Sequence, residues 1–314
     1  MPRPPVVATP TFTPVTPAKR RLPSTRSVLP HVPLDGDYVR LPVGPGALHA
    51  LRFGHGGPTV LLLHGFTTNS TLWFRVAPLL VAGGCQVIVP DMLGFGESDR
   101  PLGGPFSVSA QARYVDRALA LLRVTRAVAV GQDLGCVVLR RLAAFRPERI
   151  DGLVMCSPTP GDVAGGPEID AVQGQAGPAL LEISSRQLGV VDLLGPVLRS
   201  AVSDAAASMP DRMVARFSAP YTGSQGARHL LDLARAVGEE ADLPPLSAVA
   251  PGVLNVTGED DPMVAPAAAA LIRLPGARRL LALERPGALA ALILERVTSA
   301  NRLERSLEDR RETD

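Results

Sequence analysis

The stretch Thr125–Leu142, TRAVAVGQDLGCVVLRRL, decides how the rest of the chain is interpreted. It begins with the apolar run AVAV at residues 127–130, which is long enough for a buried strand and too short for a helix. The sequence GQDLG at 131–135 follows, and then an apolar pattern typical of a helix. Glycines on both sides of a polar residue suit a sharp strand-to-helix turn, because they avoid Cβ clashes. The stretch therefore predicts a turn that holds Asp133 clear of the backbone, just before a helix N-terminus.

Composition limits the class of protein. With 314 residues, of which 46% are hydrophobic, the chain is long enough to bury one large α/β core. A net charge of +2 gives no argument for a nucleic-acid partner, and we expect a small-molecule substrate instead. No apolar run approaches the 18 residues of a membrane span, and no apolar segment near the N-terminus indicates a secretory signal.

The cysteines indicate a reducing compartment. All three lie in or beside apolar runs and are expected to be buried free thiols, which favours a cytoplasmic protein: Cys85, Cys136 and Cys156. No spacing of cysteine and histidine indicates a metal site, and nothing in the sequence indicates a cofactor.

The chain divides into a tail, a core and an insertion. Residues 1–35 are rich in proline and are expected to be a disordered tail, although a docking motif there is a second interpretation. Strands that alternate with helices over 36–157 and 251–314 predict a parallel, doubly wound α/β sheet. Between them, residues 158–250 lose this alternation and are mostly helical, so we expect a helical cap inserted over the site.

The expected strands follow from short apolar runs. An early hairpin is expected first, continuous buried strands follow it, and a last strand precedes a closing helix from about Leu289. The strands are expected at 38–42, 47–53, 59–63, 86–89, 127–130, 153–157, 252–257 and 279–283.

Two further motifs accompany the Asp133 turn. His64-Gly65-Phe66 comes directly after a buried strand, and residues 91–98 read DMLGFGES, a D-x-x-G-x-G-x-S turn. Together the three motifs resemble the α/β-hydrolase superfamily over about residues 36–308. With an aspartate at the strand-to-helix turn, the nucleophile elbow of that superfamily, the chain resembles the branch that contains epoxide hydrolases and dehalogenases. The resemblance implies an α/β-hydrolase fold with a cap.

The resemblance also implies roles for single residues. Asp133 would attack an electrophilic sp³ carbon and form an alkyl ester, which a histidine oriented by an acid would then hydrolyse. Asp261, in a G-x-x-D-P setting after a strand, is similar to that acid. The structural alternatives are a helix N-cap for Asp133 and a turn-forming residue for Asp261. The residues implied for oxyanion stabilisation or substrate binding are His64, Gly65, Phe66, Leu134 and Tyr221.

The histidine itself is missing from the pattern. The family's G-H-[FL] step is matched here by Gly287-Ala288-Leu289, which places Ala288 at the histidine position. No histidine follows His229, which lies in the expected cap and is more simply a structural residue. Markers of the subfamilies are absent too, since Leu134 replaces a halide-binding tryptophan and Thr67 replaces the proline of H-G-x-P.

Three hypotheses for function remain at this stage. The first is a non-hydrolytic enzyme of secondary metabolism, such as a lyase, isomerase or cyclase, that uses Asp133 as general acid or base, with Asp261 able to share a proton or water with it. The second is an epoxide-hydrolase-like enzyme with an atypical alanine in the triad. The third is a catalytically inactive protein that binds a small ligand in the same pocket.

Overall fold

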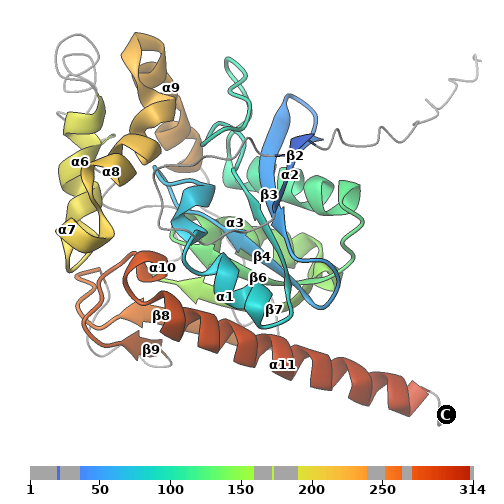
Figure 1. Ribbon diagram of the computed structural model, residues 1–314. Helices are drawn as coiled ribbons and strands as arrows, with labels where there is room; N and C mark the ends of the chain where they lie inside the picture. The colour runs from blue at the N-terminus through green and yellow to red at the C-terminus, as the bar shows by residue number, and fades with distance from the viewer. Residues whose placement is uncertain are drawn as a thin grey trace, which may run out of the picture.

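Nine strands in the described part of the chain form one sheet, in the order β1-β2-β3-β5-β4-β6-β7-β8-β9 (Figure 1). The computed structural model describes residues 20–21, 36–158, 172, 190–238, 252–263 and 271–311. The strands are β1 (Arg20–Arg21), β2 (Gly36–Pro42), β3 (Ala47–Phe53), β4 (Thr59–Leu63), β5 (Gln86–Pro90), β6 (Ala127–Gln132), β7 (Ile150–Cys156), β8 (Val253–Gly258) and β9 (Leu271–Leu274).

The sheet is antiparallel at one edge and parallel elsewhere. The β2–β3 hairpin pairs antiparallel with β5, and every later pair from β4–β5 to β8–β9 is parallel. The central strands are nearly all apolar, because helices cover both of their faces. The predicted doubly wound α/β sheet is confirmed. The order also places β4 between β5 and β6, where the winding reverses direction and ligands bind in such sheets.

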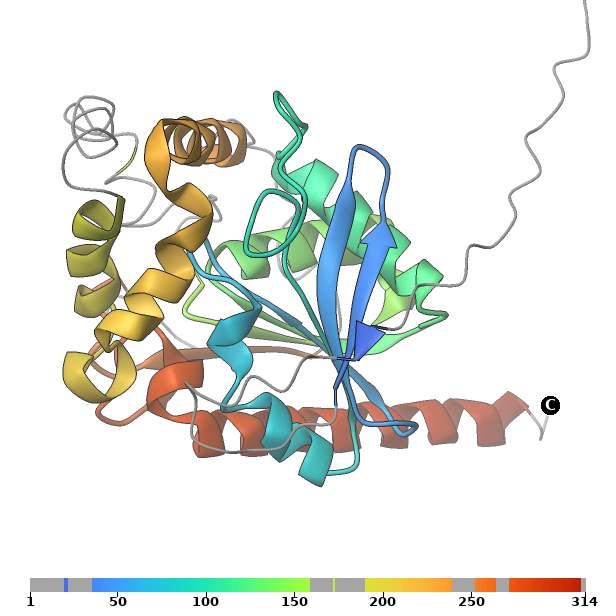
Figure 2. The same ribbon diagram turned by 45° about the horizontal axis from the view of Figure 1, so that its top comes forward.

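Helices form a layer on each face of the sheet. Figure 2 shows α1 and α11 below the sheet, with α2 and α3 above it. These helices and the short 3₁₀ turns of the core are η1 (Ser70–Trp73), α1 (Ala77–Ala82), α2 (Val108–Leu121), α3 (Leu134–Phe145), η2 (Pro147–Arg149), α10 (Leu281–Glu284) and α11 (Pro286–Arg311).

A second group of helices gathers at one end of the sheet, on the left of both ribbon views. It contains α6 (Val190–Ser200), α7 (Ala205–Ser208), α8 (Asp211–Ser218), η5 (Ala219–Tyr221) and α9 (Gly223–Gly238). Its contacts include loops that follow β4 and β5: Asn69 Nδ2 donates to the Arg216 carbonyl at 3.2 Å, and His229 Nε2 lies 2.7 Å from the Gly94 carbonyl. The rest of the expected cap, at 159–171, 173–189 and 239–250, lies outside the described residues.

One predicted strand is wrong. The last strand is Leu271–Leu274, which pairs parallel with β8, whereas the expected strand at 279–283 falls on a turn and on α10. The run after Pro275 is apolar because it packs beneath the neighbouring helices, with Leu280 to Leu283 all buried. An apolar run of this length cannot distinguish a buried strand from a short buried helix.

The structure describes two residues of the expected tail, and its described helices bear on the membrane prediction. Arg20–Arg21 pairs antiparallel with β2, and the remainder of the 1–35 tail lies outside the described residues. Among the helices that the structure describes, none has the length and apolar character needed to cross a bilayer.

Candidate active site

The strand-to-helix turn places Asp133 at the carboxyl end of β6. Asp133 has φ +50° and ψ −115°, a conformation that non-glycine residues rarely adopt and that often marks a functional position. Its N–H donates to the Cys156 carbonyl at 3.2 Å, which fixes the turn against β7. A Cβ at Gly135 would lie 2.5 Å from the Leu63 carbonyl oxygen, so only glycine lets α3 approach the end of β4. The two glycines therefore serve the function that the sequence predicts.

The Asp133 carboxylate is buried, with 6% of the residue exposed, and each of its oxygens has a different partner. Oδ2 accepts a hydrogen bond of 3.2 Å from the Phe66 N–H, in the loop after β4. Oδ1 accepts a hydrogen bond of 2.5 Å from Arg279 Nη2, and the exposed fractions of these two side chains are 4% and 9%. The carboxylate makes no side-chain capping bond to α3, so it is not a conventional N-cap.

Arg279 is held in place by its own backbone. Its N–H donates to the Ala201 carbonyl at 3.0 Å, and its carbonyl accepts from Gln132 Nε2 and Ser157 Oγ, each at 3.0 Å. These contacts join the loop after β9 to the strands β6 and β7 and to the helical group. The guanidinium is therefore directed at Asp133 by a rigid loop.

The sequence interpretation missed Arg279 and selected Ala288 instead. Ala288 is exposed in the first turn of α11 and is not the residue that faces Asp133 after the last strand. The error follows from the misplaced strand, because a strand at 279–283 would move the following loop about nine residues along the chain. A usable signal was present, since Arg278 and Arg279 are charges directly before the apolar run that ends at Leu283.

His64 supports the loop after β4, and its ring hydrogen bonds go to the backbone and not to Asp133. Because the Met92 N–H donates to Nε2 at 3.0 Å, the proton of the neutral ring lies on Nδ1, which donates to the Gly65 carbonyl at 2.8 Å. Burial lowers the pKa of His64. Gly65 donates its N–H to Thr68 Oγ1 at 3.0 Å, so the loop that presents Phe66 is fixed at several points.

Asp261 is buried in the turn after β8. Its oxygens accept from Thr257 Oγ1 at 3.3 Å and from the Met263 N–H at 3.0 Å. The turn packs against the loop that carries Arg279, since the Asp260 N–H donates to the Ala277 carbonyl at 3.0 Å. No hydrogen bond joins Asp261 to Asp133 in the described residues, and the group that meets Asp133 is Arg279.

The other predicted site residues take different places. Leu134 is the buried first residue of α3, directly beside Asp133. Tyr221 lies in η5, where burial raises the pKa of its phenol and its hydroxyl has no hydrogen-bond partner among the described residues. His229 stacks on Tyr221 with ring centroids 6.5 Å apart, and burial lowers its pKa. These residues are candidates for the lining of a site.

The D-x-x-G-x-G-x-S turn is structural in this fold. Asp91 is buried and accepts from His49 Nδ1 at 2.9 Å, from the Ser70 N–H at 2.6 Å and from the Glu97 N–H at 2.9 Å. Burial alone raises the pKa of Asp91, but the His49 hydrogen bond, the neighbouring histidines and the backbone donor outweigh it, and the pKa is lowered. The turn thus fixes the loop after β5 against the loop after β4.

Thiol and metal chemistry have little support in the described residues. The cysteines are free and buried as predicted, and burial raises the pKa of Cys156 to about 12, so its thiolate form is negligible near neutral pH. Among the residues the structure describes, no group of three His, Cys, Asp or Glu side chains could hold a metal ion.

The comparisons with known proteins agree on the fold. The alpha/beta hydrolase fold family matches residues 58–188. The structure of Cfl2 from Burkholderia cenocepacia superposes with a TM-score of 0.70 at 22% identity, covering 89% of this chain and 99% of that one. The epoxide hydrolase CorEH superposes with a TM-score of 0.65 at 18% identity, covering 83% of this chain and 98% of that one. The chain therefore has the α/β-hydrolase fold.

Sequence relatives match a shorter segment. A haloalkane dehalogenase from Mesorhizobium japonicum is 34% identical over 114 residues, which is 36% of each chain. A fluoroacetate dehalogenase from Burkholderia sp. is 37% identical over 106 residues, covering 32% of this chain and 34% of that protein. The chain thus matches about a third of the length of these curated relatives, which are dehalogenases by name.

Proposed function

We propose that this protein binds a small, largely apolar molecule beside Asp133 and does not hydrolyse it through an ester of Asp133. The observation that carries the proposal is the buried contact between Arg279 Nη2 and Asp133 Oδ1, at 2.5 Å. An arginine holds the carboxylate at the place where an ester-hydrolysing site of this kind needs a base.

Among the described residues, the side chain that hydrogen-bonds to Asp133 is Arg279, and it offers no base for the second step of a two-step hydrolysis, the attack of water on the ester. Water must lose a proton as it attacks the ester, and a guanidinium stays protonated near neutral pH, so Arg279 cannot accept that proton. Three described histidines have ring hydrogen bonds, and none of these bonds reaches Asp133. The partner of His49 is Asp91, that of His64 is the loop after β4, and that of His229 is the Gly94 carbonyl.

The first step of such a hydrolysis, attack of Asp133 on the substrate, is disfavoured as well. For Oδ1 to attack a carbon atom, it must separate from Arg279 within a buried site. Removing one partner of a buried ion pair costs about 3–5 kcal/mol. As an upper bound, a penalty of that size slows attack by about a hundredfold to several thousandfold.

A second candidate function is the covalent capture of an epoxide as an ester of Asp133 that is not hydrolysed, and two observations favour it. Asp133 keeps the strained backbone of an elbow residue, and the Phe66 N–H holds its other oxygen at 3.2 Å. In that reaction Oδ1 would bond to an epoxide carbon, and the carbon–oxygen bond of the ring would break. The ring oxygen would then take a proton from solvent, leaving a stable ester on Asp133.

Intact-protein mass spectrometry tests both candidates. The protein is incubated with styrene oxide and, separately, with 1-bromohexane, and Asp133→Asn is the control. We expect no added mass and no diol from the native chain. An adduct that is absent in the control would support the second candidate over the first, and steady release of diol would overturn both.

A gain-of-function variant tests the role of Arg279. Arg279→His removes the guanidinium and supplies an imidazole on the loop that packs against the Asp261 turn. We expect this variant to form the ester and release some diol from styrene oxide, and Asp133→Asn/Arg279→His to do neither. An Arg279→His variant as inert as the native chain would contradict the view that Arg279 blocks the chemistry.

Binding is measured separately. A series of small apolar alcohols and epoxides is added to the native chain, and the thermal unfolding temperature is recorded. We expect a concentration-dependent rise with some members of the series. No rise with any member would contradict the binding role.

A further inference from the structure

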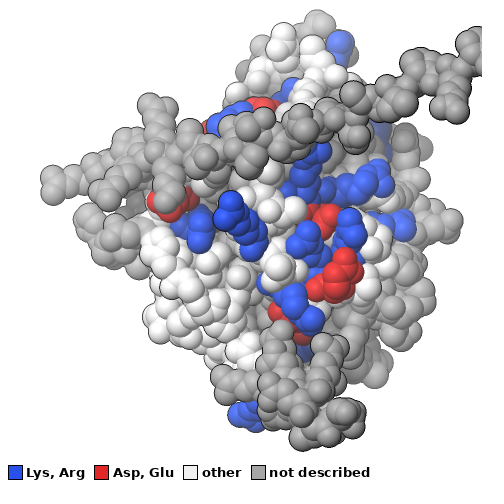
Figure 3. Space-filling view, turned by 90° about the vertical axis from the view of Figure 1, so that its right-hand side faces the viewer, with Lys and Arg blue, Asp and Glu red and all other residues white. Residues whose placement is uncertain are grey.

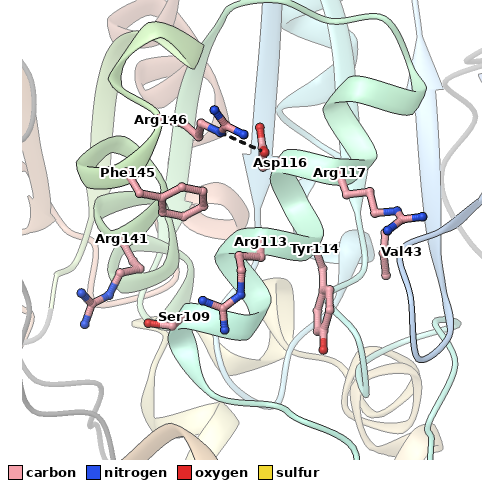
Figure 4. A pocket seen from close by; sticks show the side chains of 9 residues that line it. All are labelled: Val43, Ser109, Arg113, Tyr114, Asp116, Arg117, Arg141, Phe145 and Arg146. Carbon is pink, nitrogen blue, oxygen red and sulfur yellow. Dashed lines mark hydrogen bonds and ion pairs between the residues drawn. The ribbon is translucent and has the colours of Figure 1, made fainter. Parts of the chain in front are cut away.

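A hollow lies between α2 and α3, with a volume of about 710 Å³ (Figure 4). Its lining includes Arg113 and Arg117 from α2, and Arg141, Phe145 and Arg146 at the end of α3. The volume falls within the range of about 300–1,000 Å³ that is usual for small-molecule sites. None of its lining residues belongs to the Asp133 site.

The hollow is separated from Asp133 by the length of α3. Asp133 precedes the first residue of that helix, and Phe145 is its last residue. At a rise of 1.5 Å per residue, the two ends lie about 18 Å apart. A ligand in this hollow would therefore not touch the Asp133–Arg279 pair.

Positive charge dominates the lining. Four arginines and one carboxylate, Asp116, line the hollow. Asp116 already accepts from Arg146 Nε at 3.3 Å and from Arg149 Nε at 2.8 Å, so its charge is engaged. Figure 3 shows arginines gathered, with acidic side chains between them, on the right-hand side of Figure 1, where α2 lies.

Arg113 gives the clearest sign of an unmet partner. It is exposed and makes no hydrogen bond or ion pair with any residue in the described part of the chain. Arg113 and Arg117 lie four residues apart on one face of α2, and both line the hollow. An anion bound between them would contact both guanidinium groups.

An aromatic ring accompanies the arginines. Phe145 is 40% exposed, and its ring extends from α3 toward α2, between Arg113 and Arg146 (Figure 4). A flat ring beside guanidinium groups can stack on a planar ligand while the guanidinium groups bind its anionic part. Arginine side chains bind phosphate groups through paired N–H donors, as they bind carboxylates.

We propose that the α2–α3 hollow binds a small phosphorylated molecule that carries an aromatic ring, of the class of nucleoside mono- and diphosphates. Arg113 and Arg117 bind the phosphate, and Phe145 stacks against the ring. Binding is independent of Asp133.

Isothermal titration calorimetry with ADP at 50 mM NaCl tests the proposal, with AMP, pyrophosphate and adenosine as separate probes. We expect ADP to bind, adenosine to bind much more weakly, and 300 mM NaCl to weaken ADP binding severalfold. Arg113→Gln/Arg117→Gln is expected to weaken ADP binding at least tenfold. Phe145→Ala is expected to weaken ADP binding without changing pyrophosphate binding.

Two control variants locate the site. Arg302→Gln removes an exposed arginine from α11, and Asp133→Asn alters the other site, so neither is expected to change ADP affinity. The thermal unfolding temperature of each variant shows that it remains folded. No binding of ADP, AMP or pyrophosphate would overturn the proposal. Equal weakening by Arg302→Gln would overturn the placement, and a Phe145→Ala variant with native ADP affinity would overturn the stacking role.

Discussion

The contact between Asp133 and Arg279 is the residue-level feature on which the proposed function rests. The Arg279 guanidinium and the Phe66 N–H occupy both oxygens of the Asp133 carboxylate. The backbone of Asp133 has φ +50°, a conformation that costs free energy and that holds the side chain at the end of β6.

The ion pair should also be visible in stability. Arg279→Met leaves the Asp133 carboxylate buried without its cation, and we expect the free energy of unfolding to fall by about 3–5 kcal/mol. Asp133→Asn/Arg279→Met removes both charges and should be less destabilised than Arg279→Met alone. Urea unfolding of the four proteins gives the coupling energy, and strict additivity would mean that the pair contributes no coupling.

At the scale of elements, the close approach of α3 to β4 sets the distance between Asp133 and Phe66. This approach depends on Gly135, where a Cβ would lie 2.5 Å from the Leu63 carbonyl oxygen and 2.8 Å from that of His64. Both are backbone atoms, so neither can move aside without shifting β4. The elbow and the loop after β4 are therefore positioned as one unit.

Gly135→Ala tests this packing. We expect it to lower the free energy of unfolding by about 1–3 kcal/mol, because overpacking forces the backbone to shift. Gly287→Ala in the exposed first turn of α11 is the matched control, since nothing lies within 4 Å of its added Cβ. There we expect a small gain, at most about 1 kcal/mol. Thermal or urea unfolding measures both, and a Gly135→Ala variant as stable as the native chain would show that β4 and α3 can separate freely.

At the scale of the whole molecule, stability should depend on pH in two steps. Burial lowers the pKa of His64 from 6.5, so below about pH 6.5 this histidine binds a proton in the unfolded chain before it does so in the folded chain. The pKa of Asp91 is lowered from 3.8, so its contribution is present above that value and is lost as pH falls through its folded pKa.

We therefore expect the free energy of unfolding to fall as the pH is lowered from 6.5, by at most about 1.4 kcal/mol per pH unit for each such histidine. His229, whose pKa is also lowered, adds to this first step. His64→Gln should reduce the slope between pH 6.5 and 5, and Asp91→Asn should reduce the loss below pH 4. Urea unfolding at a series of pH values measures both, and a flat profile from pH 7 to 5 would contradict the first step.

Much of the architecture was predictable from local pattern. The runs before residues 64, 91, 133 and 157 are short, apolar and bounded by turn residues, and each forms a buried parallel strand. The GQDLG turn required glycine on both sides, and the structure shows the carbonyl that excludes a larger residue. These features are determined by the sequence because they depend on a few neighbouring residues and on burial of apolar side chains.

The partner of Asp133 was decided only by the tertiary structure. Arg279 is 146 positions away along the chain, and its place depends on where the last strand ends and on hydrogen bonds to Ala201, Gln132 and Ser157. The apolar run LLAL that follows it, at 280–283, is compatible with a strand or with a turn and a helix, and packing against the rest of the molecule favoured the second. The sequence by itself determined a carboxylate at the strand-to-helix turn of an α/β-hydrolase fold, and the assembly of distant loops determined that an arginine faces it.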